Sequence, residues 1–335
     1  MHKEGNYKKL FDDFNHLNIL IIGDVMVDSY LWGKVERISP EAPIPIVALR
    51  KRENRMGGAA NVAMNLRAMG ANPILCSVIG ADEKGDQFLD LLKKEKITDD
   101  GIVRSSRRIT TTKFRIFGNS CQMLRVDEEI DNDLVQGDFL TLIRVIDQIL
   151  AKVKVDCIIF QDYDKGVITQ KLIEEVVGRA NAAKIPVTVD PKKKNFMTYK
   201  HVTLFKPNLK EMKDGLSLNE ELADNQSVID AAQKLRTMLD CKYVLTTMSD
   251  KGVLMSLKEK AEERNIFIPA HMRMISDVSG AGDTVISLAS LCLAMNRNPN
   301  EIAYISNLAG GLVCEEVGVV PINKEKLLRE VMGLL

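Results

Sequence analysis

The sequence predicts an α/β fold of three layers, in which helices cover both faces of a mostly parallel central sheet. Two observations carry this prediction. Short apolar runs typical of buried strands recur at 18–23, 73–80, 156–162, 186–190, 201–208 and 243–247. Segments with helical periodicity alternate with them, at 58–69, 85–95, 134–152, 169–184, 226–239 and 283–295. Such alternation sets successive strands parallel and packs helices on both faces of the sheet.

Two segments depart from this alternation and predict a small second sheet. Residues 25–55 and 110–126 alternate partially, as strands do, and no helix separates the strands within either segment. Prolines at 40, 43 and 45 exclude a helix in the first segment and mark turns or a sheet edge. We expect one domain over residues 1–335, with this sheet projecting from it as a lid, a dimer surface or both.

Composition and charge exclude several classes of protein. The 335 residues carry 46 basic and 46 acidic side chains, which argues against a nucleic-acid partner recognised by overall charge. The charged N-terminus has no signal-peptide core, and no apolar run is long enough to span a membrane. Six scattered cysteines form no CxxC pair, and the four histidines are too far apart for a zinc motif. These features predict a cytoplasmic protein with no membrane partner.

The stretch VSGAGDT, residues 278–284, precedes a long uncharged segment and predicts an anion site. Its glycines allow positive φ and a close approach of ligand to backbone. If a helix begins at about Asp283, the amides of Gly280, Ala281 and Gly282 point into one concavity that favours anions. The alternative is that Asp283 merely caps a buried helix, since aspartate is a favoured N-cap residue.

Two longer motifs resemble the signatures of the ribokinase family, also called the PfkB family. DVSGAGD at 277–283 is similar to its C-terminal signature, and GGAANVAMNLRAMGANPILCSVIGAD at 57–82 is similar to its N-terminal signature. The likeness extends from about residue 18 to about residue 321. Members transfer the γ-phosphoryl group of ATP to a sugar or nucleoside hydroxyl. The resemblance implies a ribokinase-like fold with a β-sheet lid, with Asp283 as general base and the amides of Gly280, Ala281 and Gly282 as an anion hole.

Other roles follow from the resemblance at matching positions. Asn208 and Glu211 match an NxxE motif that organises Mg²⁺ and its waters; the alternative is that Glu211 lies on an exposed helix face. The positions that match the nucleotide site are Thr247, Ser249, Gly252 and Asn307. The positions that match the sugar site are Asp24, Asp28, Gly57, Gly58 and Asn61. The alternative for the two acids is a solvated turn. The implied cofactors are ATP and Mg²⁺, and a requirement for K⁺ stays open.

Three stretches resemble one branch of the family, which phosphorylates the anomeric hydroxyl of D-glycero-β-D-manno-heptose 7-phosphate on the route to lipopolysaccharide core. They are GDVMVDSYLWGKVERISPEAPIPIV at 23–47, QDYDKG at 161–166 and DPKKKNF at 190–196. A phosphorylated substrate requires cations, and Lys165, Lys192 and Arg125 are the candidates; the alternative for the lysine run at 192–194 is a solvated basic loop.

The chain also departs from that branch. Gln161 stands where the resemblance predicts serine, and GVVPI near residue 320 replaces a GT-containing end. No HxGH motif of a nucleotidyltransferase domain is found, so we expect a separate chain to transfer the adenylyl group.

The sequence leaves three alternative functions. One is a PfkB kinase for another sugar, such as fructose 1-phosphate or ribose. Another is a non-catalytic protein on the same fold that binds nucleotide or sugar. The third, a dinucleotide-binding oxidoreductase, is disfavoured because the first strand is not followed by GxGxxG. A homodimer through the lid strands is expected, because exposed sheet edges favour pairing.

Overall fold

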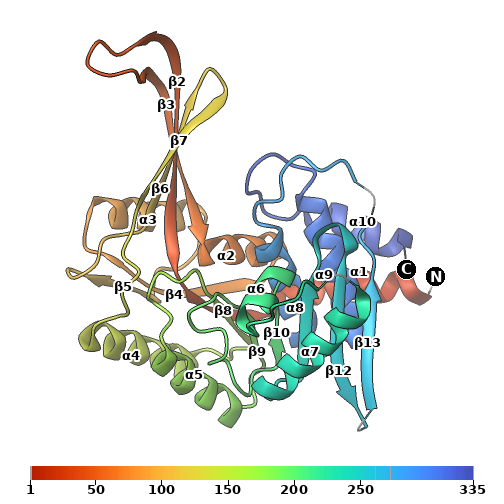
Figure 1. The fold of residues 1–335 in the computed structure, drawn as a ribbon. Coiled ribbons are helices and arrows are strands. Elements are labelled where there is room, and N and C mark those ends of the chain that lie inside the picture. The colour runs from red at the N-terminus through yellow and green to blue at the C-terminus, as the bar shows by residue number, and fades with distance from the viewer. Residues whose placement is uncertain (1, 223, 261, 272, 335) are drawn as a thin grey trace.

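A nine-stranded sheet forms the centre of the protein. The computed structural model describes residues 2–222, 224–260, 262–271 and 273–334. The strands of this sheet are β1 (Asn18–Gly23), β4 (Asn72–Gly80), β5 (Ile102–Ser105), β8 (Cys157–Gln161), β9 (Val187–Asp190), β10 (Leu204–Phe205), β11 (Tyr243–Thr247), β12 (Val253–Glu259) and β13 (Glu262–Ile268). Their order is β13-β12-β11-β10-β9-β8-β1-β4-β5, and the strands from β11 to β5 run parallel (Figure 1). The predicted mostly parallel sheet is confirmed.

Helices cover both faces of this sheet and complete three layers. They are α1 (His2–Asp13), α2 (Ala59–Ala68), α3 (Glu83–Lys94), α4 (Gln136–Lys152), α5 (Gln170–Ala182), α6 (Leu209–Gly215), α7 (Asn225–Leu239), α8 (Ala281–Ala294), α9 (Pro299–Val313) and α10 (Lys324–Leu334), with 3₁₀ turns η1 (Phe14–His16) and η2 (Ser249–Lys251). In β1, Ile19 and Ile21 pack with α1–α3 and α8–α10, whereas Leu20 and Ile22 pack with α4–α7. No helix in the described part of the chain is long and apolar enough to cross a membrane.

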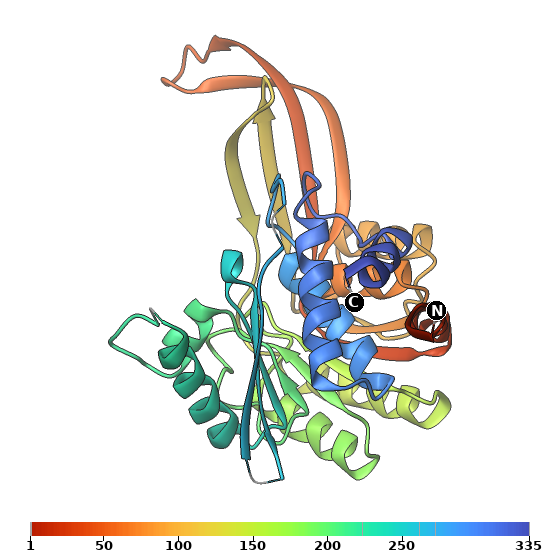
Figure 2. The same ribbon diagram turned by 90° about the vertical axis from the view of Figure 1, so that its right-hand side faces the viewer.

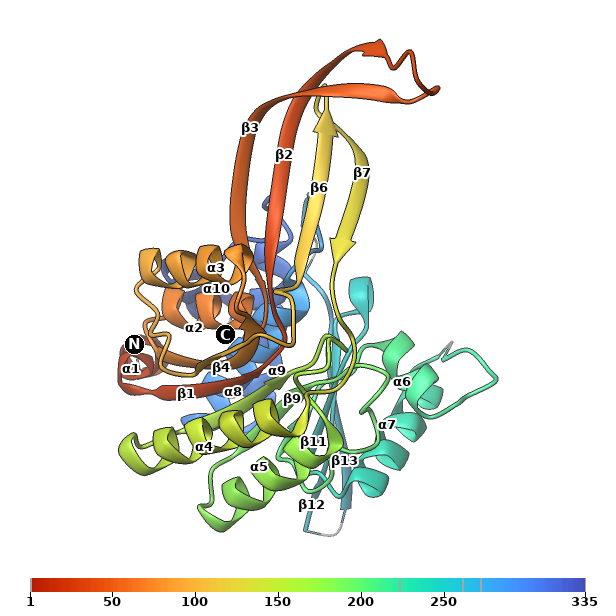
Figure 3. The ribbon, with the colours of Figure 1, turned by 90° about the vertical axis from the view of Figure 1, so that its left-hand side faces the viewer.

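The second sheet has four strands and projects from the body (Figures 2 and 3). Its strands are β2 (Val25–Ile38), β3 (Pro45–Gly58), β6 (Thr112–Gly118) and β7 (Cys121–Glu128), in the order β3-β2-β6-β7. The small separate sheet that the sequence predicts is therefore present. Its strands reach beyond residues 55 and 126, and Pro45 opens the edge strand β3.

An aromatic stack stiffens the projecting sheet. The ring centroids of Tyr30 and Trp32 on β2 lie 5.4 Å apart, and Phe117 on β6 lies 6.0 Å from Trp32. The ammonium group of Lys51 on β3 lies 4.8 Å from the centre of the Trp32 ring. Cross-strand aromatic and cation–π contacts of this kind stabilise a sheet that has little core beneath it.

The structure also differs from the sequence predictions in local detail. Helices α1 and α10, strand β5 and the hairpin β12–β13 were not predicted, and the helix α6 was predicted only as the alternative for Glu211. The strand predicted at 201–208 shortens to the two residues of β10, because turns occupy the residues before it and Pro207 cannot donate to the sheet.

Gly58 joins β3 to α2 in a conformation that requires glycine. Its φ is +63°, and a Cβ there would lie 2.3 Å from the backbone oxygen of Asp24.

We expect Gly58→Ala to lower the free energy of unfolding by about 2 kcal/mol or more, because it adds both strain and overlap. The control is Gly178→Ala in α5, where a Cβ meets open space. It should stabilise by about 0.5–1 kcal/mol. Urea denaturation measures both, and equal effects would contradict this account.

Candidate active site

The N-terminus of α8 presents unpaired backbone donors. Gly280 is the N-cap residue, with a φ of +80° in the left-handed region, and the helix begins at Ala281. The N–H of Ala281 donates to the carbonyl of Val278 at 3.3 Å. Among the described residues, no acceptor pairs with the N–H groups of Gly280, Gly282 and Asp283. These three donors lie at the positive end of the helix and could hold an anion.

The predicted start of this helix was wrong by two residues. Gly280 reverses the chain at once because glycine tolerates positive φ, so Asp283 falls in the first turn of α8 instead of at its N-cap. The alternative that Asp283 is only a cap is therefore excluded, and its buried side chain serves another purpose.

Three side chains hold the Asp283 carboxylate. The Asn61 amide donates to Oδ2 at 3.2 Å, and the Gln161 amide and the Tyr163 hydroxyl donate to Oδ1 at 3.1 Å and 2.8 Å. These donors come from α2, the end of β8 and the loop after it. Burial raises the pKa of Asp283 to about 6, helped by the negative charge of Asp190 and opposed by the hydrogen bonds from Tyr163 and Asn61. The carboxylate is thus a stronger base than a solvated aspartate, and it is still ionised at neutral pH.

A buried ion pair lies beside this carboxylate. Lys206 follows β10 and its ammonium nitrogen lies 3.1 Å from Asp190 Oδ1, and both side chains are less than 10% exposed. The Gln161 amide also donates to Asp190 Oδ2 at 3.2 Å. A Cβ on Gly282 would lie 3.5 Å from the Lys206 nitrogen, so a cation lies next to the open amides of α8. The sequence analysis missed Lys206, although a lysine that interrupts the apolar run HVTLFKPN was its available signal.

Asp24 organises a loop instead of lying in a solvated turn. Its carboxylate accepts hydrogen bonds from the backbone N–H groups of Tyr163, Lys165 and Val167, at 2.9–3.1 Å, and it is 1% exposed. Burial raises its pKa, and these hydrogen bonds oppose the rise. Asp24 therefore fixes the loop that carries Tyr163 to Asp283, which leaves its oxygens little capacity for sugar hydroxyls.

Asp28 lies at the base of the projecting sheet. It accepts a 2.6 Å hydrogen bond from Arg115 on β6, and a Cβ on Gly57 would lie 2.5 Å from its Oδ2. The guanidinium groups of Arg115 and Arg55 both lie over the Tyr30 ring, at 5.3 Å and 4.9 Å. Neither arginine was predicted as a site residue, and together they bring positive charge to the face of the sheet that carries Asp28.

The three predicted phosphate-binding cations each have an acidic partner. Lys165 pairs with Glu129 at 2.7 Å, Arg125 pairs with Asp127 at 2.9 Å, and Lys192 pairs with Glu211. Lys192 also lies 5.9 Å from the centre of the Tyr163 ring, close to Asp283. A substrate phosphate would have to share these cations with their acidic partners or displace those partners.

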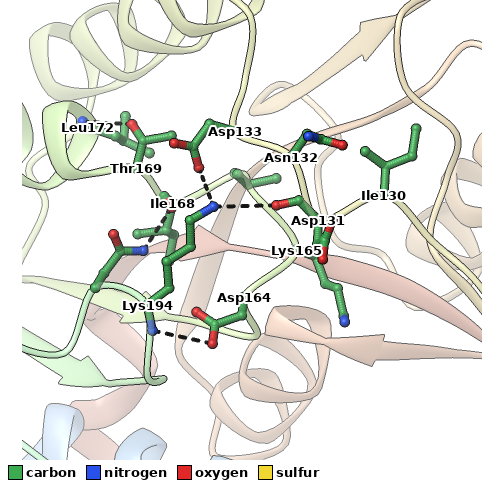
Figure 4. A network of polar contacts seen from close by, with 12 residues as sticks. Ile130, Asp131, Asn132, Asp133, Asp164, Lys165, Ile168, Thr169, Leu172 and Lys194 are labelled. Atoms are coloured by element: carbon green, nitrogen blue, oxygen red, sulfur yellow. Dashed lines mark hydrogen bonds and ion pairs between the residues drawn. The ribbon is translucent and has the colours of Figure 1, made fainter. Parts of the chain in front are cut away.

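Lys194, the last lysine of the basic run, is part of a separate polar network. Its ammonium group donates to Asp133 at 2.7 Å and to the carbonyl of Asp131 at 3.5 Å, and its backbone N–H approaches Asp164 (Figure 4). Arg108 ties the same segments together by donating to the carbonyls of Asn132 and Lys165. This lysine therefore joins two loops and is not freely solvated.

Asn208 and Glu211 form the capping box of α6. The Asn208 side chain accepts from the Glu211 N–H at 2.8 Å, and Glu211 Oε2 accepts from the Asn208 N–H at 2.9 Å. Both Glu211 oxygens are engaged, because Lys192 pairs with the other one. Asn208 and Glu211 therefore suit hydrogen bonds to the waters of a hydrated Mg²⁺ better than direct ligation of the ion. Over the described residues no cluster of three or more His, Cys, Asp or Glu side chains suits a metal ion.

The four predicted nucleotide-site residues divide into two groups. Thr247 ends β11 and bridges to Asn208, and Ser249 and Gly252 follow in a tight turn with φ values of +53° and +95°. Asn307 lies apart on α9, where its amide donates to the carbonyl of Pro269 at 2.9 Å. The first group lies at the carboxyl end of the sheet, where ligands of open α/β sheets bind.

Comparison with known proteins gives the family. The model of the pfkB family carbohydrate kinases matches residues 16–326. The chain belongs to this family. It is 35% identical over 321 residues to the bifunctional protein HldE of Caulobacter sp. strain K31, and 37% identical over 301 residues to that of Helicobacter acinonychis strain Sheeba. These matches cover 96% and 90% of this chain but 64% and 63% of the relatives, so the chain spans just under two thirds of their length.

Solved structures of the family share the fold. Escherichia coli phosphofructokinase-2 in complex with potassium superposes with a TM-score of 0.75 at 18% identity, covering 94% of this chain and 99% of that one. Arabidopsis thaliana ribokinase complexed with ribose and ATP gives 0.71 at 15% identity, covering 93% and 99%. The predicted ribokinase-like fold is confirmed. Family membership makes the chain a sugar kinase that transfers phosphate to a hydroxyl group, and it excludes the oxidoreductase.

The raised pKa of Asp283 predicts that Asp283→Asn stabilises the fold at alkaline pH. The unfolded chain loses this proton near pH 4, as free aspartate does at about 3.9, whereas the folded protein loses it near pH 6. The stability contributed by this group is full below the lower value and is lost as pH rises through about 6. We expect the variant to melt a few degrees above wild type at pH 8, to keep about half of that advantage at pH 5 and to lose the rest as the pH falls below about 4, in differential scanning fluorimetry.

Asp90→Asn, at an exposed acid of α3, is the matched control and should show no such pH dependence. A variant that melted below wild type at pH 8 would contradict the account.

Proposed function

We propose that the chain phosphorylates the anomeric hydroxyl of D-glycero-β-D-manno-heptose 7-phosphate with ATP, giving the 1,7-bisphosphate. The observation that carries this proposal is the similarity to the bifunctional protein HldE, which extends over at least nine tenths of this chain in the relatives compared above. Resemblance of residues 23–47, including RISPEAP, to the heptose phosphate branch supports the same substrate. The product would supply ADP-heptose synthesis in the cytoplasm.

Asp283 acts as the general base in this proposal. Its carboxylate removes the proton of the anomeric hydroxyl while the hydroxyl oxygen bonds to the γ-phosphorus, and the bond to ADP breaks. The open amides of Gly280, Gly282 and Asp283 and the ammonium group of Lys206 face the negative charge of the transferring group. Bound Mg²⁺ supplies further neutralisation of the phosphates, and Asn208 and Glu211 would hold it through water.

The remaining ligand assignments are part of the same proposal. Thr247, Ser249, Gly252 and Asn307 border the nucleotide. Asp28, Gly57 and Asn61 border the sugar, and a substrate phosphate draws on Lys165, Lys192 or Arg125. A monovalent cation is included only as a variable to test, because the E. coli phosphofructokinase-2 structure contains potassium.

A coupled ADP-release assay tests the reaction. We expect rapid turnover of D-glycero-D-manno-heptose 7-phosphate and little turnover of fructose 1-phosphate, fructose 6-phosphate or ribose. Since Asp283 must be ionised, kcat/KM should fall as the pH drops below about 6. Asp283→Asn should lose several orders of magnitude in kcat and still bind ATP.

Turnover of another sugar alone would overturn the heptose assignment and keep the mechanism. A loss in Asp283→Asn of less than tenfold would remove the general-base role. Failure to turn over any sugar, with ATP still bound, would favour the non-catalytic alternative.

The projecting sheet is proposed to serve as both lid and dimer surface. β7 is an edge strand, and its Leu124 and Val126 are about half exposed on one face of the sheet. Exposed apolar side chains on an unpaired edge favour association with a second copy of the chain. Arg115 and Asp28 lie on the same sheet, nearer the body. A lid movement would therefore change their distance from Asp283.

Light scattering coupled to gel filtration checks the dimer. Wild type should have the mass of two chains, and Leu124→Glu with Val126→Glu should have the mass of one, because buried carboxylates would oppose the contact. Leu140→Glu, at an equally exposed leucine on α4, should leave the mass of two chains unchanged. A monomeric wild type, or a dimer that tolerates both glutamates, would overturn this surface.

A further inference from the structure

Gln161 occupies the centre of the candidate site, although no role for it follows from the resemblance. It is the last residue of β8, pairs in register with Gly23 of β1, and is 1% exposed. The resemblance predicts serine at this position. A serine has one O–H and can donate to one acceptor, whereas the glutamine amide can donate twice.

Both hydrogens of the Gln161 amide are used by carboxylates. Nε2 lies 3.1 Å from Asp283 Oδ1 and 3.2 Å from Asp190 Oδ2. Turning the amide over would set its oxygen against two carboxylates, so these contacts fix its orientation. The side chain thus separates two acids that otherwise repel each other.

The fixed orientation leaves the Gln161 carbonyl oxygen without a partner. Oε1 is buried, and no donor in the described part of the chain reaches it. A buried acceptor without a hydrogen bond is uncommon in folded proteins, and it is often explained by a functional role. Because Oε1 belongs to the same amide as Nε2, it lies beside the carboxylate that receives the proton of the reacting hydroxyl.

The chemistry of the ligands decides what can satisfy this oxygen. The transferring phosphoryl group offers oxygens that accept hydrogen bonds, so it cannot pair with Oε1. Sugar hydroxyls donate, and the hydroxyl that reacts gives its own proton to Asp283. The hydroxyl on the neighbouring carbon is then the donor that remains close to the base.

We propose that Gln161 determines acceptor specificity: its Nε2 positions the Asp283 carboxylate, and its Oε1 accepts a hydrogen bond from the sugar hydroxyl next to the one that is phosphorylated. This inference rests on the proposed role of Asp283 as base. For an anomeric acceptor, the neighbouring hydroxyl is that on carbon 2.

Paired sugars and two substitutions test the inference. The assay compares kcat/KM for the preferred sugar of the panel and for its analogue that lacks the neighbouring hydroxyl, which for the heptose phosphate is the 2-deoxy compound. Gln161→Met keeps the length of the side chain and removes both polar atoms. Gln161→Glu keeps an acceptor oxygen and replaces the donor. ADP-induced shifts in melting temperature confirm that each variant is folded.

Wild type should prefer the complete sugar by about 100-fold, since the analogue without the hydroxyl leaves one buried acceptor, Oε1, without a partner. Gln161→Met should lose this preference to within about threefold, mainly through a higher KM for the complete sugar, while Gln161→Glu should keep about tenfold or more. Equal preference in wild type and Gln161→Met would overturn the role of Oε1.

The pH profile tests the positioning role separately. The charged and titratable groups that face Asp283 are Asp190, Lys206, Lys192 and Tyr163. Losing the donor between the two acids increases their repulsion, so the acid limb of kcat/KM should move up by about one pH unit in Gln161→Met. It should move at least as far in Gln161→Glu, because that variant places a third carboxyl group beside the two acids. If the acid limb of the pH profile did not move in these variants, the proposal that Nε2 positions the Asp283 carboxylate would be wrong. A wild type inactive on every sugar would overturn this inference together with the proposed function, whereas activity with unchanged preference overturns this inference alone.

Discussion

The burial of one ionised carboxylate constrains the rest of the site. Asp283 lies where the first turn of α8 meets the carboxyl end of the sheet, and it keeps its charge only because three side chains and a nearby lysine compensate for lost water. A second acid, Asp190, opposes that charge and raises the pKa. The arrangement sacrifices stability and raises the pKa of the carboxylate, which suits the general-base role proposed for Asp283.

Much of the surrounding structure supports that carboxylate indirectly. Asp24 does not contact Asp283. It accepts three backbone hydrogen bonds from the loop that carries Tyr163, and Tyr163 in turn donates to Asp283. The capping box of Asn208 and Glu211 likewise fixes the start of α6 and, through Lys192, joins it to the loop after β9. Residues that the family resemblance assigns to ligands thus also hold one another in position, before any ligand arrives.

The elements that the sequence predicts best are those whose signal is local. Apolar runs such as NILIIG mark buried strands, and the glycines at 280 and 282 mark the start of a helix near Asp283. The helix begins two residues earlier than predicted because Gly280 adopts positive φ, which the sequence permits but does not require. Lys206 was missed because an apolar run hides it, and its partner Asp190 comes from another strand. The contacts of Gln161 could not be predicted either, since they form only where the ends of β8 and β9 meet the start of α8.

The aromatic stack of the projecting sheet has a spectroscopic consequence. Trp32 is the only tryptophan in the chain, and it lies on β2 in contact with Tyr30 and Phe117, with Lys51 over its ring. Indole emission from the unmodified protein therefore originates in this one sheet, while the nine-stranded body is silent at that wavelength. The molecule carries an intrinsic optical label on the part of its fold that extends farthest from the body, so changes in the polarity or quenching around that sheet can be followed without attaching a dye.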